Sequence, residues 1–287
     1  MPLSVDTLSF GSLVSVGRAI ARQVAGPLLD ESNGTDLFLV AFPQSGLAWL
    51  ARLYANASLI LAGDPRRVTQ FNLDDLVPAE DLRRPAGAPP LPVPEFRCFK
   101  SDAPFTPRYR KVIYLVRDPR RVMADRHAEL VERGQWRGSL EEMLRHRRHG
   151  IRAWTAHAAG WLDQVETPAF ALVRHEDLSA RTAFELTRLF DLLGWHLDPA
   201  QAAQAVARAG EAGWAQPDPR RGGGALPRGA EPASAGAIPL SAMRLIGEAA
   251  GPLMRRLGYL AEPAEVPSPA LGSPAPLVRL FADSSSG

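Results

Sequence analysis

The sequence predicts an α/β fold in which helices cover both faces of a parallel sheet. Three short runs are apolar throughout, and a helical pattern follows each of them: Leu37–Phe42, Val112–Val116 and Phe170–Val173. Strands that are apolar on both sides are typical of parallel sheets, because helices bury both faces. A chain of 287 residues is long enough to enclose such a sheet. We therefore expect three layers with the sheet in the middle.

The composition is that of a globular protein, with 46% hydrophobic and 22% charged residues, which excludes a structureless or fibrous chain. Cys98 is the single cysteine, so an intramolecular disulfide and a Cys-based zinc site are excluded. No run approaches the roughly 20 apolar residues of a membrane span. The first 30 residues lack the ordered pattern of a secretion signal. We expect a soluble, cytoplasmic protein with no membrane contact.

The positive charges are nearly all guanidinium groups, since Lys100 and Lys111 are the only lysines. Guanidinium forks suit planar anions such as phosphate and sulfate, although a GC-rich coding bias would give the same composition. The net charge is only +2, and basic residues do not alternate with aromatic ones. The sequence therefore argues against a nucleic-acid partner.

The first expected strand, Leu37–Phe42, follows an N-terminal extension of residues 1–35. It ends at Pro43, and apolar residues with helical spacing begin at Trp49. This pattern predicts a strand, a tight loop and a helix. The proline-rich stretch Arg83–Glu95 is expected to be a surface loop.

The second and third expected strands are followed by helices as well. Arg117-Asp118-Pro119 ends the second strand, and Gly194 closes a helical stripe after the third. The segment Gln216–Pro239 is rich in Gly, Pro and Arg, and Met243–Leu257 predicts a last helix. We expect one domain over residues 36–260 and a loose tail over residues 261–287.

Three loops contain candidate binding groups. Phe42–Trp49 places backbone N–H groups at the start of a helix, which favours an anion, or it is only a connector. Arg117–Arg121 concentrates three guanidinium groups beyond a strand, or it is a solvated helix start. Arg220–Gly224 combines two arginines with three glycines that let backbone amides approach a phosphate, or it is only a basic loop.

These segments, in this order, resemble the sulfotransferases that use the sulfated nucleotide PAPS, from about Asp36 to Leu260. FPQSGLAW is similar to the family's YPKSGTTW loop, KVIYLVRDPRRV to its strand and RxP segment, and CFKSDAPF to its KTHxP stretch. WTAHAAGW resembles the WxxHxxxW helix, LVRHEDL the YEDL segment, and RRG the RKG segment. The resemblance implies a P-loop-like fold, PAPS as cofactor, and transfer of a sulfuryl group to a hydroxyl or amine.

The resemblance also implies the binding residues. The first loop would hold the 5′-phosphosulfate, Trp49 would border the adenine or belong to the core, and His175 would contact the adenine edge or lie on the surface. The 3′-phosphate would meet residues of the second and third loops. The expected cofactor-binding residues are Gln44, Ser45, Gly46, Leu47, Ala48, Trp49, Arg117, Asp125, His175, Arg220, Arg221 and Gly222.

Five positions depart from the family pattern. Gln44 replaces the lysine at the leaving phosphosulfate, and Leu47 and Ala48 replace two threonines. Removal of one such donor typically lowers the rate by about 100 to 1000-fold. Asp102 stands where the family has its histidine base, and with an ordinary pKa of about 3.9 it is a weaker base. Asp125 replaces a serine at the 3′-phosphate, which it repels by roughly 4 kcal/mol at about 4 Å and an effective dielectric of about 20.

Three functions are therefore open. The first is a weakened sulfotransferase with Asp102 and Gln44 as catalytic residues. The second is an inactive homologue, a pseudoenzyme, that serves binding or regulation. The third is an enzyme for an adenine nucleotide without the 3′-phosphate, because a carboxylate at the ribose accepts hydrogen bonds from free hydroxyls.

The remaining histidines are assigned no chemistry. His157 is expected to be a structural residue of its helix. His146 and His149 lie among Arg145, Arg147 and Arg148, a pattern typical of a solvated basic helix face, and no metal site is expected. The acceptor, a small molecule or a carbohydrate, is expected to contact Arg83–Glu95 and Val131–Ser139.

Overall fold

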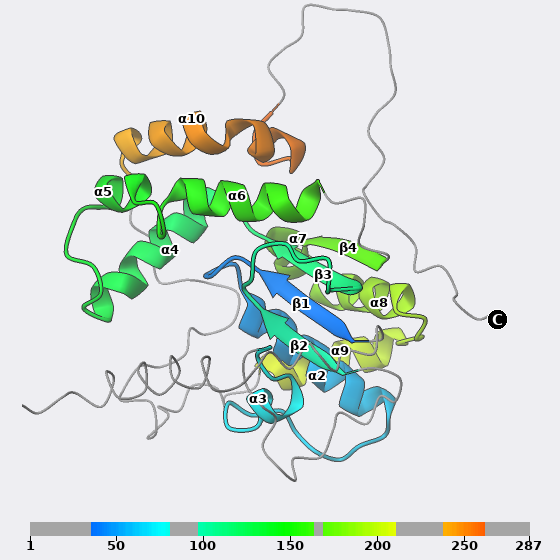
Figure 1. The fold of residues 1–287 in the computed structure, drawn as a ribbon. Coiled ribbons are helices and arrows are strands. Elements are labelled where there is room, and N and C mark those ends of the chain that lie inside the picture. Colours follow the sequence, from blue (N-terminus) through cyan, green and yellow to red (C-terminus); the bar gives the residue numbers. More distant parts are fainter. Residues whose placement is uncertain (1–35, 81–96, 164–168, 211–237, 262–287) are drawn as a thin grey trace, which may run out of the picture.

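A computed structural model describes residues 36–80, 97–163, 169–210 and 238–261. Four parallel strands form one sheet in the order β2-β1-β3-β4, as Figure 1 shows. The strands are β1 (Leu37–Ala41), β2 (Cys98–Ser101), β3 (Lys111–Val116) and β4 (Ala169–Arg174). Each neighbouring pair is parallel, so all four carboxyl ends meet at one edge.

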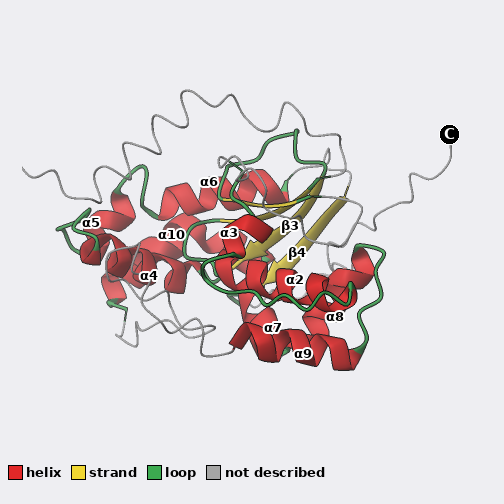
Figure 2. Ribbon diagram, turned by 90° about the horizontal axis from the view of Figure 1, so that it is seen from below, coloured by secondary structure: helices red, strands yellow, loops and turns green. Residues whose placement is uncertain are grey.

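Helices cover both faces of the sheet (Figures 1 and 2). One face packs against the first group, which consists of α2 (Leu47–Leu61), α3 (Leu73–Leu76), α7 (His175–Ala180), α8 (Thr182–Leu192) and α9 (Pro199–Gly210). The opposite face packs against α4 (Pro119–Glu132), α5 (Leu140–Arg145), α6 (Ile151–Leu162) and α10 (Leu240–Arg256). The predicted three-layer α/β fold is confirmed.

Strand β1 shows why two cores exist. Successive side chains of a strand point to opposite faces. Leu37 and Leu39 therefore enter the first core, while Phe38 and Val40 enter the second. All the residues of β1 are buried, which explains their continuous apolar pattern.

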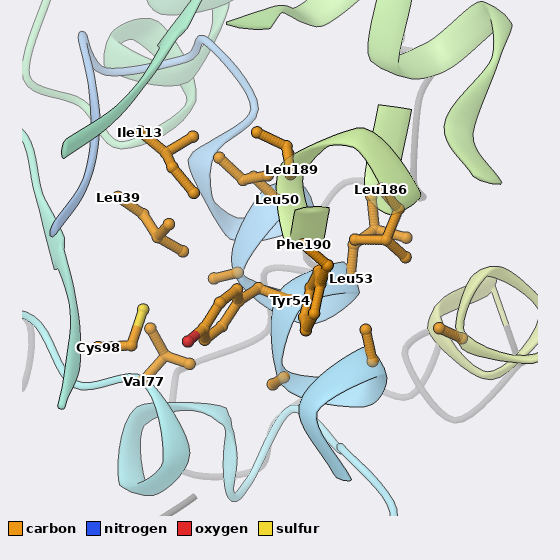
Figure 3. Packing of buried hydrophobic residues seen from close by; sticks show 14 of the residues in the cluster. Leu39, Leu50, Leu53, Tyr54, Val77, Cys98, Ile113, Leu186, Leu189 and Phe190 are labelled. Atoms are coloured by element: carbon orange, nitrogen blue, oxygen red, sulfur yellow. The ribbon is translucent and has the colours of Figure 1, made fainter. Parts of the chain in front are cut away.

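The first core joins the sheet to α2 and α8, and Figure 3 shows it from close by. Leu39 and Ile113 from the sheet face Leu50 and Tyr54 of α2. The ring of Tyr54 lies 5.5 Å from that of Phe190 on α8. This packing holds the start of α2 at the carboxyl edge of the sheet.

The second core is rich in aromatic residues. The rings of Phe38 and Tyr109 stack at 3.8 Å, and Tyr109 also stacks on Trp161 of α6 at 5.7 Å. Helix α10 completes this layer with Ile246 and Met254, which are buried on one of its faces. The last predicted helix is thus present, although it begins at Leu240 rather than Met243.

The three predicted strands are confirmed to within one residue at each end, and Gly194, with φ of 81°, follows α8 as expected. Strand β2 was not predicted, because its sequence CFKS is short and half polar. The expectation of a basic helix face at His146 and His149 is wrong. These residues lie in the turn between α5 and α6. The turn ends at Gly150, where a Cβ atom would lie 2.2 Å from the carbonyl oxygen of Leu144.

The expected extension over residues 1–35, the loop Arg83–Glu95, most of Gln216–Pro239 and residues 262–287 of the tail lie outside the described residues. The division into a domain over residues 36–260 with two extensions therefore stays a prediction. Among the described residues, no helix is long and apolar enough to cross a bilayer.

Candidate functional site

The candidate site lies at the carboxyl edge of the sheet, where ligands bind in open α/β folds. The loop Phe42–Gly46 follows β1, Asp102 follows β2, Arg117 follows β3, and His175 follows β4. Because the strands are parallel and adjacent, these four segments meet along one edge. The sequence prediction that these positions share a site is consistent with this topology.

The loop between β1 and α2 has an unusual backbone. Gln44 has φ of 67° and Gly46 has φ of 94°, both in the left-handed region. A Cβ atom at Gly46 would lie 2.5 Å from Cδ2 of His175, so the position requires glycine for conformation and for space. The amide of Ser45 donates to the carbonyl of Phe42 at 3.1 Å, and α2 begins at Leu47. The loop therefore ends in the N-terminus of a 15-residue helix.

Ser45 adds a polar group to this helix start. Its side chain is 1% exposed, and its Oγ has no hydrogen-bond partner among the described residues. A buried hydroxyl without a partner is costly, so such a group is typical of a place that a ligand completes. Together with the free backbone amides of the helix start, Ser45 fits an anion such as phosphate or sulfate.

The other predicted residues of the first loop differ in their surroundings. Leu47 and Trp49 pack against the first core, and the guanidinium of Arg52 lies 4.8 Å from the Trp49 ring. Ala48 is exposed. The reading of Trp49 as a core residue is thus supported.

Arg117 and Asp125 bind each other. The Arg117 Nη1 donates to Asp125 Oδ2 at 2.7 Å and to the carbonyl oxygen of Gln44 at 2.9 Å. Both side chains of the ion pair are 8% exposed. Arg117 therefore links the first loop to α4, and its charge is already balanced by a carboxylate.

Gln44 is held by a residue that the sequence analysis did not select. Its Nε2 donates to Oε2 of Glu129 at 2.5 Å, and Glu129 also pairs with Arg133 at 2.7 Å. Glu129 follows Asp125 by one helical turn, so both carboxylates face the loop from α4. This i, i+4 spacing was the available signal in the sequence.

His175 is buried rather than on the surface, which corrects one of the two readings of this residue. Burial, and after it the positive charge of Arg117, lowers its pKa to about 4. The imidazole is therefore neutral near pH 7. It packs against Gly46 at the first loop.

Asp102 is exposed at the end of β2. Its neighbour in space is His157 of α6, whose Nδ1 lies 3.1 Å from the hydroxyl of Tyr114. Burial lowers the pKa of His157 to about 4, and the backbone of Ala103 offsets part of this effect. His157 is thus a buried helix residue, as predicted, whereas Asp102 is exposed.

A second group of contacts fixes the turn after β3. Glu176 accepts from the amide of Asp118 at 2.9 Å and from the hydroxyl of Tyr259 at 2.9 Å. Arg120 donates to the carbonyl oxygen of Tyr259 at 3.1 Å, and Asp118 caps α4. Sequence reasoning missed Tyr259, because it lies 83 residues from Glu176.

Arg220, Arg221 and Gly222 lie outside the described residues, so their predicted contact with the nucleotide is untested. Within the described ranges, no group of three His, Cys, Asp or Glu side chains has the geometry of a metal site. Among the described residues, Ser45 and the start of α2 offer groups that fit an anion. The described residues do not present an unpaired arginine at the position expected for the 3′-phosphate.

The sequence model of the sulfotransferase domain matches residues 34–209. Sulfotransferase 2A1 of Rattus norvegicus is 26% identical over 182 residues, which cover 57% of this chain and 61% of the relative. Sulfotransferase 2A6 of Mus musculus is also 26% identical over 182 residues, which again cover 57% of this chain and 61% of the relative. The chain thus spans about three fifths of the length of these relatives.

Two solved structures are similar at lower identity. Mouse sulfotransferase SULT7A1 complexed with PAP has a TM-score of 0.46 and 15% identity, and the match covers 62% of this chain and 64% of that chain. Retinol dehydratase in complex with androsterone and the inactive cofactor PAP has a TM-score of 0.45 and 17% identity, with 61% and 64% covered.

Proposed function

Because the chain belongs to the sulfotransferase domain family, we propose that it binds a sulfated adenine nucleotide at the loop Phe42–Gly46 and transfers its sulfuryl group to an acceptor. The observation that carries this proposal is the buried Oγ of Ser45 at the start of α2, which has no partner among the residues that the structure describes. A helix start with an orphaned hydroxyl is built to receive an anion. The acceptor is a hydroxyl or amine of a small molecule or a carbohydrate, and the proposed location is the cytoplasm.

Asp102 and Gln44 are the proposed catalytic residues. A bond forms between the acceptor oxygen or nitrogen and sulfur, the bond from sulfur to the leaving phosphate oxygen breaks, and the acceptor proton passes to the carboxylate of Asp102. Gln44 has two amide protons, so one can face the leaving oxygen while the other stays on Glu129. A neutral donor at Gln44 and a weak base at Asp102 support slow transfer. The expected rate is lower by about 100-fold or more than the rate with a charged donor.

A second candidate function is favoured by the ion pair of Arg117 and Asp125. A 3′-phosphate that approached Arg117 would also meet the buried carboxylate of Asp125. A free ribose hydroxyl instead donates to a carboxylate, which has room for several hydrogen bonds. This candidate is an enzyme for adenosine phosphosulfate or another adenine nucleotide without the 3′-phosphate, and here PAPS is disfavoured.

The third candidate is an inactive homologue that keeps the fold for binding or regulation. The substitutions at Gln44 and Asp102 support it, since both lie where the family places its reacting groups. This candidate differs from the others only in turnover, because the anion loop remains.

Calorimetric titration with PAPS, adenosine phosphosulfate and adenosine 3′,5′-bisphosphate tests the three candidates. Tighter binding of PAPS supports the first, and tighter binding of adenosine phosphosulfate supports the second. Nucleotide binding without sulfate transfer to any of a panel of hydroxyl and amine acceptors supports the third. Failure of all three nucleotides to bind at high micromolar concentration would overturn the proposal.

A further inference from the structure

The guanidinium of Arg126 on α4 is half-buried and poorly compensated. Its one hydrogen bond within the described part of the chain is to Nδ1 of His149 at 3.1 Å, and it forms no ion pair there. Its Nε is buried and has no hydrogen-bond partner in the described ranges. Burial holds the pKa of Arg126 below its ordinary value, and the carboxylates of Glu129 and Asp102 offset only part of this effect. Arginines in such places are ordinarily paired, so a further anion is expected.

The groups beside Arg126 add hydrogen-bond donors. Arg126 always carries its protons, so His149 accepts with Nδ1 and keeps its own proton on Nε2. Burial, and then the charges of Arg126, His146 and Arg148, lower the pKa of His149. His149 is therefore a neutral donor near pH 7, and the exposed Arg148 supplies a second guanidinium.

The turn that carries these donors has a fixed shape. Nδ1 of His146 accepts from the backbone amides of Arg148 and His149, both at 3.3 Å. The two imidazole rings stack at 4.9 Å, and Trp136 meets the His146 ring edge-on at 5.3 Å. Because the turn is held by these contacts, little conformational freedom is lost when a ligand binds.

The cluster adjoins the proposed reaction centre. The Arg126 guanidinium lies 5.4 Å from the ring of Phe42, the residue that opens the first loop. The ring of Phe42 also lies 5.6 Å from that of His157, which contacts the backbone at Asp102. Trp136 belongs to Val131–Ser139, the segment expected to meet the acceptor. An acceptor whose hydroxyl or amine reaches Asp102 therefore has Arg126 within reach of its other end.

We propose that Arg126, His149 and Arg148 form an anion subsite for the acceptor, which carries a carboxylate, sulfate or phosphate group besides its reacting hydroxyl or amine. The guanidinium and imidazole N–H groups form charge-assisted hydrogen bonds with such an anion. The assignment of this anion to the acceptor rests on the proposed function, whereas the anion subsite itself does not.

Binding of a matched pair of probes tests this subsite without any nucleotide. The probes are 4-hydroxybenzoate and its methyl ester, which differ in one negative charge, and binding is followed by ligand-observed NMR titration. The wild-type protein is expected to bind the acid at least about tenfold more tightly than the ester, the scale of one charge-assisted hydrogen bond. Arg126→Gln removes the preference, and Arg126→Lys keeps part of it.

The matched control is Arg152→Gln, which removes an exposed arginine of α6 and the same net charge. It should keep the preference for the acid. His149→Phe retains the stacked ring without its nitrogens, and it should reduce the preference even if Arg126→Gln fails to fold. Inorganic sulfate should displace the acid, and unchanged binding of the acid in excess sulfate would overturn the subsite.

Equal affinity for acid and ester in the wild-type protein would overturn the proposal, and so would an unchanged preference in both Arg126→Gln and His149→Phe. Tight binding of sulfate combined with no binding of the acid would show a site for free inorganic anions, which also overturns an acceptor subsite. Failure of the nucleotide titrations would refute the proposed function while leaving this preference measurable, so the two failures are distinguishable.

Discussion

Two neighbouring parts of the carboxyl edge of the sheet differ in whether they are open to an anion. At the start of α2, Ser45 offers a buried hydroxyl with no partner among the described residues. Beside α4, Arg117 is already paired with Asp125 at 2.7 Å, and Gln44 is already bound to Glu129 at 2.5 Å. The first part is open to an anion, whereas carboxylates of α4 occupy the second.

The difference arises from two carboxylates of α4 and not from Asp125 alone. Asp125 is accompanied by Glu129 one helical turn later, and the two carboxylates accept from Arg117 and Gln44. An intramolecular carboxylate thus balances the charge of Arg117. The site keeps its anion loop while the neighbouring arginine is neutralised.

Removal of Arg117 should have the largest effect on stability. Arg117→Met leaves the carboxylate of Asp125 buried without its cation, which typically costs about 3 to 5 kcal/mol of unfolding free energy. Chemical denaturation in urea measures this change. The double variant Arg117→Met with Asp125→Leu should recover most of the loss, because the uncompensated charge is gone. A single variant as stable as the wild type would show that the pair does not hold the loop.

Acidification should destabilise the protein through His175 and His157. The pKa of each is about 4 in the folded protein, below the ordinary value of 6.5, because both rings are buried. The unfolded chain therefore binds more protons between these values, and stability falls as the pH drops from about 6.5 to about 4, by about 1.4 kcal/mol per pH unit for each histidine. Above pH 6.5 the two groups cause no pH dependence.

Denaturation of His175→Gln and His157→Gln across this pH range separates the contribution of His175, at the edge of the sheet, from that of His157, on α6. Each variant should lose about half of the histidine contribution, and the titration of carboxylates, common to all three proteins, cancels in the difference. If the stability of His175→Gln falls with pH as steeply as that of the wild type, the His175 ring takes up its proton in the folded protein as readily as in the unfolded chain.

The fold was largely predictable from the sequence, because burial on both faces leaves a continuous apolar run. Leu37–Phe42 and Val112–Val116 were recognised for this reason. Strand β2 was not, since it is only four residues long and includes Lys100, whose amine binds Asp74 at 2.5 Å. A short strand with polar residues leaves only a weak pattern.

The site was predictable only in its local parts. Ser45 and Gly46 are contiguous, and their helix start is encoded by the loop itself. The partner of Gln44 lies 85 residues away on α4, and the hydroxyl that Glu176 accepts lies 83 residues away at Tyr259. Such pairs depend on how helices pack over the sheet, which no local pattern specifies. The turn at Gly150 was misread because its basic residues fit a helix surface equally well.

Asp125→Ser tests whether the part of the edge beside α4 accepts a phosphate once the carboxylate that pairs with Arg117 is removed. It removes a carboxylate that repels a phosphate by roughly 4 kcal/mol at about 4 Å. The affinity for PAPS relative to adenosine phosphosulfate should therefore rise at least about tenfold, as measured by calorimetry. Glu132→Gln, which changes an exposed carboxylate of the same helix, is the matched control and should leave the ratio unchanged. An unchanged ratio in Asp125→Ser would mean that the 3′-phosphate binds elsewhere.

Ser45→Ala tests the open part of the edge, and its effect should appear in binding rather than in stability. The hydroxyl has no partner to lose among the described residues, so the free energy of unfolding should stay within about 1 kcal/mol or rise. The affinity for the nucleotide should fall by about tenfold, because a hydrogen bond to an anion is lost. Ser58→Ala removes another buried hydroxyl of α2, several turns from the loop, and should leave the affinity unchanged. Loss of stability with unchanged affinity in Ser45→Ala would mean that this hydroxyl serves the fold, and the two parts of the edge would then be alike.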